Sequence, residues 1–227
     1  MAHIYNTIPH IEEAVTSLPI LQSAVLPQLN NLLAHYELGS TFGVVLVHRH
    51  FDLVDSGEQV VDLKGPGTIV SSVFKDGQPD SQIVSEYELE VPEEYTIVPA
   101  KFIVRDELIP YEYMCVPKEE EPVYASHLET IPIDFLREWN FILKNYCAQD
   151  KMGLADILNA DDESGTEHTD KERRLNIVTL SDCLEDGSYV PTLWQPQGDP
   201  KLPARACCCA MSLDERPWPT SLNENRR

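Results

Sequence analysis

Basic residues are scarce in this sequence, and their scarcity argues against two classes of partner. The 227 residues contain 17 Lys+Arg against 38 Asp+Glu, which gives a formal net charge of −21 at pH 7. Such a charge repels phosphate backbones and anionic lipid headgroups, so we expect neither nucleic-acid binding nor electrostatic docking on a membrane. The same acidity favours solubility and would attract cations or basic partners.

Long apolar runs are also missing. No stretch approaches the roughly 20 apolar residues of a transmembrane helix. The first residues, MAHIYN, have neither the basic flank nor the apolar core of a signal peptide, and Ala2 is incompatible with N-myristoylation. We therefore expect a protein without a transmembrane segment in the cytoplasm, with the nucleus as the alternative. In these compartments its six cysteines are mostly reduced thiols.

The common enzyme motifs are absent as well. The sequence contains no GxSxG nucleophile elbow, no P-loop, no GxGxxG, no HExxH and no paired CxxC. No reaction is therefore predicted by a motif.

One strand that ends in polar residues does point to chemistry. Residues 43–51 read GVVLVHRHF, in which five residues without polar side chains precede His48, Arg49 and His50. Alternate side chains of an extended chain share a face, so we expect His48 and His50 side by side and Arg49 on the opposite face. Two imidazoles at this spacing can bind one metal ion if a third ligand joins them, and Glu58 is the nearest carboxylate after the strand.

This cluster has two interpretations. In the first, His48, His50 and Glu58 hold a divalent metal ion as the candidate cofactor. In the second, His48, Arg49 and His50 form a hydrogen-bonded polar cluster that binds a ligand or supports the fold, with Arg49 buried against a carboxylate. An HxH pair alone is a weak metal signal, so the second interpretation is preferred.

Hydrophobic periodicity predicts helices at both ends of a strand-rich region. Residues 10–38 read as helical, with Pro19 and Pro27 dividing them into short helices and Gly39 as the C-cap. Residues 133–147 have the clearest helical pattern, and a further short turn is expected around 154–158. Residues 159–174 are polar and read as a mobile loop.

Between and after these helices the pattern is that of short strands. We expect strands at 59–64, 68–74, 81–91, 96–104, 111–116 and 175–180, the last paired with 188–194 across a turn at 185–187. The order of elements predicts an α+β fold, a mainly antiparallel sheet with helices packed on one face. A single domain is expected over residues 1–195.

Residues 196–227 read as an irregular C-terminal tail, because prolines recur and the apolar pattern fades. The tail contains Cys207, Cys208 and Cys209. Adjacent cysteines are poorly placed to share one tetrahedral zinc ion. A loop of small residues at a sheet edge is preferred over reversible S-acylation, which clustered cysteines near a terminus also permit.

Two resemblances are carried by particular residues. The order Gly43, His48, His50, Glu58 and Gly65 resembles the first motif of cupins, but the spacing from histidine to glutamate is longer and no later histidine supplies their second motif. The segment LVHRHFDL at 46–53, with PAKFIVRDELIPYEY at 99–113 and the cysteine-rich C-terminus, resembles uncharacterised small proteins of filamentous fungi that carry an HRHF motif. This second resemblance implies no activity beyond a link to secondary metabolism.

We therefore expect a soluble acidic binding or accessory protein without catalysis, whose partner is a small molecule or another protein. The alternative is a metal-dependent, cupin-like enzyme that acts on a small molecule through His48 and His50.

Overall fold

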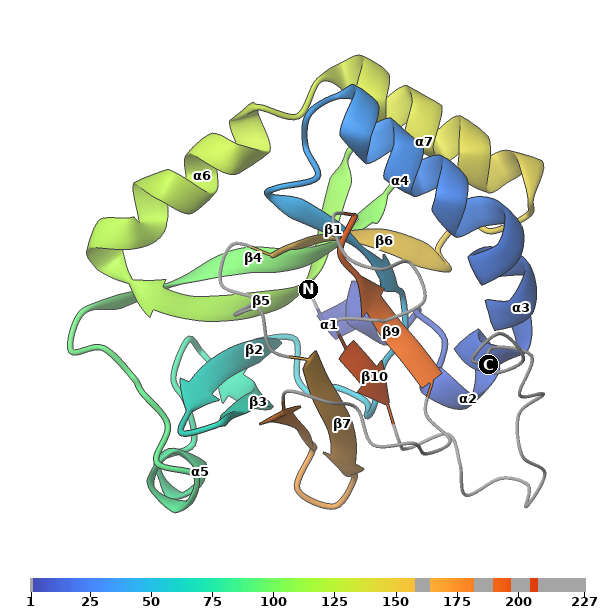
Figure 1. Ribbon diagram of the computed structural model, residues 1–227. Helices are drawn as coiled ribbons and strands as arrows, with labels where there is room; N and C mark the ends of the chain where they lie inside the picture. The colour runs from blue at the N-terminus through green and yellow to red at the C-terminus, as the bar shows by residue number, and fades with distance from the viewer. Residues whose placement is uncertain (1, 158–163, 182–189, 197–204, 208–227) are drawn as a thin grey trace, which may run out of the picture.

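The computed structural model describes residues 2–157, 164–181, 190–196 and 205–207, and its described strands close into a β-barrel (Figure 1). The order around the barrel is β1-β6-β4-β5-β2-β3-β8-β7-β10-β9, and β9 pairs with β1 to close the ring. The strands are β1 (Phe42–Leu46), β2 (Glu58–Gly65), β3 (Thr68–Lys75), β4 (Tyr95–Val104), β5 (Leu108–Pro117), β6 (Met152–Asp156), β7 (Ser164–Asp170), β8 (Leu175–Ser181), β9 (Val190–Trp194) and β10 (Arg205–Cys207).

Neighbouring strands are antiparallel except in two pairs, β2 with β5 and β7 with β10. The predicted α+β class with a mainly antiparallel sheet is therefore confirmed. The sheet is closed into a barrel, which the sequence did not predict, and the helices α4 and α7 pack on its outer face.

The helices contact the barrel at several places. They are α1 (Ala2–Tyr5), α2 (Ile11–Ala14), α3 (Leu18–Ile20), α4 (Leu26–His35), α5 (Ser81–Glu86), α6 (Glu121–Glu129) and α7 (Ile133–Asn145), with 3₁₀ turns η1 (Val15–Ser17) and η3 (Lys118–Glu120) and a π-helical turn η2 (Leu21–Val25). Figure 1 shows α4 and α7 side by side over β1 and β6, and α6 over β4 and β5. None of the helices in the described residues has the length and apolar content needed to cross a membrane.

The prolines of the N-terminal segment change its helical geometry without ending it. Residues 11–35 form one continuous helical run, in which Pro19 and Pro27 occupy the first turns of α3 and α4. A proline donates no hydrogen bond and crowds the preceding turn, so the widened π-helical turn before Pro27 accommodates it. The left-handed residue at the end of α4 is Glu37 (φ 58°), in place of the expected cap at Gly39.

Alternate side chains of β1 belong to two different apolar clusters, and these clusters distinguish the outer face of the barrel from its inner face. Phe42, Val44 and Leu46 lie in one apolar cluster with α4 and α7, so these side chains face outward. Val45 belongs to a separate cluster with Ala155 and Leu193, on the inner face. Every residue of β1 is buried because both faces of the strand are covered.

Several element predictions are confirmed and others are wrong. The strands expected at 59–64, 68–74, 96–104, 111–116 and 175–180 are present, as is the helix that begins at Ile133. The expected strand at 81–91 is the helix α5, and the expected turn at 154–158 is largely strand β6. The expected loop at 159–174 contains strand β7.

The C-terminal part of the barrel also differs from the expectation. Strand β9 pairs with β1 and β10, whereas the sequence suggested a hairpin with residues 175–180; the expected turn at 185–187 lies outside the described residues. Strand β10 joins the barrel from within the predicted tail, so the domain does not end at residue 195. The side chain of Cys207, together with Cys208 and Cys209, lies outside the described residues.

Candidate functional site

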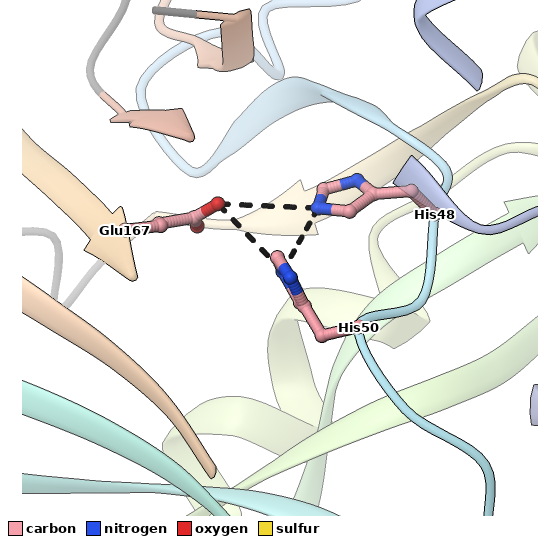
Figure 2. A group of neighbouring side chains, drawn as sticks. All are labelled: His48, His50 and Glu167. Carbon is pink, nitrogen blue, oxygen red and sulfur yellow. Dashed lines mark hydrogen bonds and ion pairs between the residues drawn. The ribbon is translucent and has the colours of Figure 1, made fainter. Parts of the chain in front are cut away.

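His48 and His50 lie just after β1, where the strand has ended at Leu46. Both are buried, and their Nε2 atoms are 3.0 Å apart. The observed strand therefore ends before the pair, with only Val47 between them, whereas the sequence predicted the pair within the strand. The two rings nevertheless lie close together, and Figure 2 shows both pointing toward Glu167.

The third member of this cluster is Glu167 on β7. Its Oε2 atom lies 3.9 Å from His48 Nε2 and 3.8 Å from His50 Nε2, and the carboxylate is buried. Figure 2 shows the Glu167 side chain pointing toward the two histidine rings, which lie on the other side of the space between them. Thr192 on β9 donates a hydrogen bond to the same oxygen at 3.3 Å, which orients the carboxylate.

Hydrogen bonds on the far side of each ring constrain the protonation of the cluster. His48 Nδ1 is 2.7 Å from the carbonyl oxygen of Leu46, which only accepts, so Nδ1 carries a proton. Neutral His48 therefore presents a lone pair from Nε2. His50 Nδ1 is 2.7 Å from Thr169 Oγ1, whose hydroxyl also lies 3.3 Å from Asn176 Oδ1. If Thr169 donates to Asn176, His50 presents a lone pair from Nε2 as well.

Glu58, the carboxylate expected to complete the metal site, is held elsewhere. Its Oε2 accepts hydrogen bonds from Arg174 Nη1 at 2.8 Å and from the backbone N–H of Val54 at 2.7 Å. Burial raises the pKa of Glu58, but the bonds from Arg174, Val54 and Asp55 outweigh it and lower the pKa below its ordinary value. The choice of Glu58 is therefore corrected: the group of metal-ligand type in the described residues is His48, His50 and Glu167.

Arg49 supports the fold near the cluster and faces a different set of groups. Its Nη1 donates to the carbonyl oxygens of Asn6 and Ile8, and its Nε lies 2.9 Å from Asp52 Oδ1 as an ion pair. The predicted pairing with a carboxylate is observed, but Arg49 is half-buried and Asp52 is exposed. Arg49 thus joins the N-terminal segment to the chain after β1.

The barrel interior also contains a cavity of about 270 Å³. Strands β2, β3, β4, β5, β6 and β9 all contribute to its wall. Its lining is apolar over Ala100, Met114, Val116 and Leu193, and it carries the charged residues Asp62, Lys64, Glu90, Lys101, Glu120 and Asp156. Because Glu90 and Glu120 are exposed, the cavity reaches the surface at that end.

Lys101 and Glu112 form a buried ion pair at this cavity. Lys101 Nζ donates to Glu112 Oε2, and the two side chains are 12% and 6% exposed. Burial raises the pKa of Glu112; the positive charge of Lys101 opposes this effect and the negative charge of Asp62 adds to it. The net direction is upward, so Glu112 holds a proton more readily than an ordinary glutamate.

Two tyrosines show that these carboxylates share one interior. Burial raises the pKa of Tyr111 well above its ordinary value, and nearby Glu112, Glu167 and Asp62 add to the effect. Burial likewise raises the pKa of Tyr5, and the negative charge of Glu112 raises it further. Both phenols therefore stay protonated, in surroundings that disfavour further negative charge.

Sequence reasoning identified the two histidines but not Glu167, Lys101 or Glu112. Glu167 lies in a polar run that resembles a loop, and the only local signal is the alternation in β7, where Gly165 and Glu167 are buried and His168 is exposed. Comparisons with protein-family models, with curated proteins and with solved structures found no significant match.

Proposed function

We propose that this protein is a small-molecule-binding β-barrel that holds a divalent metal ion at His48, His50 and Glu167. The observation that carries the proposal is the convergence of two imidazole nitrogens and one carboxylate oxygen within 4.8 Å of one another in a buried place. Two histidines and one carboxylate are a common ligand set for zinc and for non-haem iron.

The distances suit a metal ion. Two ligand atoms about 2.0–2.1 Å from a tetrahedral ion lie about 3.3–3.4 Å apart. The separations of 3.0, 3.8 and 3.9 Å lie on both sides of that value, so side-chain shifts of a few tenths of an ångström would close the site.

The outer hydrogen bonds also suit a metal ion. Metal-binding histidines usually donate their second ring N–H to a carbonyl or carboxylate group, which fixes the tautomer. Leu46 plays this part for His48, and Thr169 can play it for His50 when its own proton goes to Asn176. Both Nε2 lone pairs then face the Glu167 carboxylate, an arrangement that needs a cation between them.

The charge of the interior supports the same cation. Asp62, Glu112 and Glu167 are three carboxylic acids near one another, and Lys101 pairs with Glu112. A divalent ion at Glu167 would add positive charge to this acidic interior.

A metal-free cluster is the competing account. In it, Thr169 donates to His50 Nδ1, and His50 Nε2–H donates to His48 Nε2 across 3.0 Å. The barrel would then bind its small molecule without metal, as the non-catalytic module expected from the sequence.

A metal-dependent enzyme is the second candidate function. The observation that favours it is the cavity, which shares the barrel interior with the triad and reaches the surface. His48, His50 and Glu167 are not among the residues that line this cavity, so a substrate in it would have to extend toward the triad for a metal ion there to polarise its oxygen as a Lewis acid.

Metal titration of untagged protein tests the proposal. Isothermal titration with Zn²⁺ or Fe²⁺ should give one tight site, and Glu167→Gln should abolish it. Thr169→Val should weaken it by about 10–100-fold, the usual cost of losing an outer-shell partner. His35→Ala, at an exposed histidine, is the matched control and should bind normally. Wild-type protein without a tight site, or binding unaffected by Glu167→Gln, would support the metal-free cluster.

A further inference from the structure

Lys101 reaches the cavity through an irregularity in β4. Consecutive residues of a regular strand point to opposite faces, yet Ala100 and Lys101 both line the cavity. The pairing of Lys101 with Glu112 is flanked by two shifts of register between β4 and β5. Such bulges re-aim side chains and are common beside active sites. The irregular pairing thus turns a lysine into the barrel, where an ordinary strand would carry it outward.

The ammonium group of Lys101 lies against an acid that can take its proton. Burial penalises both the charged amine and the charged carboxylate, which favours transfer of the proton from the ammonium group to the carboxylate. The pKa of Glu112 is raised above its ordinary value, which favours the protonated carboxyl group. An amine freed in this way is a nucleophile within a cavity that small molecules can enter.

We propose that Lys101 forms a Schiff base with a small aldehyde or ketone in this cavity, with Glu112 as the group that accepts and returns the proton. Glu112 takes a proton from the Lys101 ammonium. The free amine attacks the carbonyl carbon and forms a C–N bond, and the carbonyl oxygen gains the second amine proton to give a carbinolamine. Glu112 then protonates the hydroxyl, which leaves as water, and an iminium ion remains paired with the Glu112 carboxylate.

The lining of the cavity narrows the class of carbonyl compound. Ala100, Met114, Val116 and Leu193 offer apolar contacts to an aliphatic chain. Glu90 and Glu120 at the exposed end are acidic and repel anions. The site therefore suits an uncharged aliphatic ketone or aldehyde better than a 2-oxo acid.

Borohydride trapping tests this inference independently of the metal site. Protein treated with a chelator is incubated with pentan-2-one and sodium borohydride, and the modified lysines are mapped by peptide mass spectrometry. We expect alkylation at Lys101 at least tenfold above that at the exposed Lys75 and Lys118, and weaker labelling of Lys101 when pyruvate replaces pentan-2-one. An unmodified Lys101 in wild-type protein whose exposed lysines react would overturn the proposal.

Two variants separate chemistry from packing. Glu112→Gln should reduce labelling of Lys101 at least tenfold while the circular dichroism spectrum is retained, whereas Lys75→Arg, at an exposed lysine outside the cavity, should leave it unchanged. Undiminished labelling in folded Glu112→Gln protein would remove Glu112 from the mechanism and contradict the proposal as stated. Metal binding is measured on the same preparations, so failure of one proposal is distinguishable from failure of the other.

Discussion

The contacts of Arg49 contribute unequally to the stability of the fold, and mutations can measure these contributions separately. Its Nη1 holds the backbone carbonyls of Asn6 and Ile8, whereas its ionic partner Asp52 has a side chain that is 61% exposed. Arg49→Ala should lower the free energy of unfolding by about 1–3 kcal/mol, because it strands two carbonyl acceptors. Asp52→Ala should cost less than about 1 kcal/mol, as an exposed ion pair does. Urea denaturation measures both, and equal losses would contradict this ranking.

Glu58 gives the fold a defined dependence on acid. Hydrogen bonds from Arg174, Val54 and Asp55 lower its pKa in the folded state, so its contribution to stability is complete above the ordinary value of 4.5 and is lost as the pH falls through the lowered pKa. Glu58→Gln should reduce stability at neutral pH by about 1–3 kcal/mol. The variant should also lose less further stability than wild type on acidification below pH 4.5. Parallel pH profiles for the two proteins would be inconsistent with this role.

Among the residues of the candidate site, the sequence identified those that lie close together in the chain. His48 and His50 are two residues apart, so an extended backbone places them together even though the strand itself stops at Leu46. Glu167 comes from β7, and only the barrel closure brings it to the histidines. With 38 acidic residues to choose from, proximity in sequence favoured Glu58, which is held by Arg174 instead.

Among the strands, the contact between β6 and β4 depends on a glycine. A Cβ atom on Gly153 would overlap the carbonyl oxygen of Phe102 and would lie 3.0 Å from Val47 Cγ2. Gly153→Ala should therefore push the two strands apart and destabilise the barrel by about 1–3 kcal/mol, as overpacking does. Gly57→Ala is the control, since its Cβ would meet only the mobile end of the Asp76 side chain. Thermal unfolding measures the pair, and a Gly153→Ala protein as stable as the control would contradict this packing.

Element predictions succeeded where one periodicity was dominant. The amphipathic pattern at 133–147 has no competing strand pattern, and α7 was predicted correctly. Residues 81–91 alternate in polarity, but Asp80 accepts a hydrogen bond from the backbone N–H of Gln82 and starts the helix α5. Residues 164–170 have little apolar content because one face of β7 is exposed and the other carries Glu167 into the polar interior.

In the whole molecule, closure of the barrel was not predictable from local patterns. The parallel pairs β2–β5 and β7–β10 join segments that are distant in sequence, and no local signal specifies which strands meet. Closure also turns one face of every strand into an interior, where Asp62, Glu112 and Glu167 lie near one another. The proposed metal ion follows from that arrangement, since it would neutralise charge that the fold itself concentrates.

The most direct test of the account is anomalous diffraction from crystals of untagged protein grown with one equivalent of Zn²⁺. We predict one strong peak inside the barrel, about 2.0–2.2 Å from His48 Nε2, His50 Nε2 and a carboxylate oxygen of Glu167. Data collected on both sides of the zinc absorption edge identify the element. A barrel interior without such a peak, or zinc bound only at surface carboxylates, would contradict the account and leave the two histidines as a hydrogen-bonded pair.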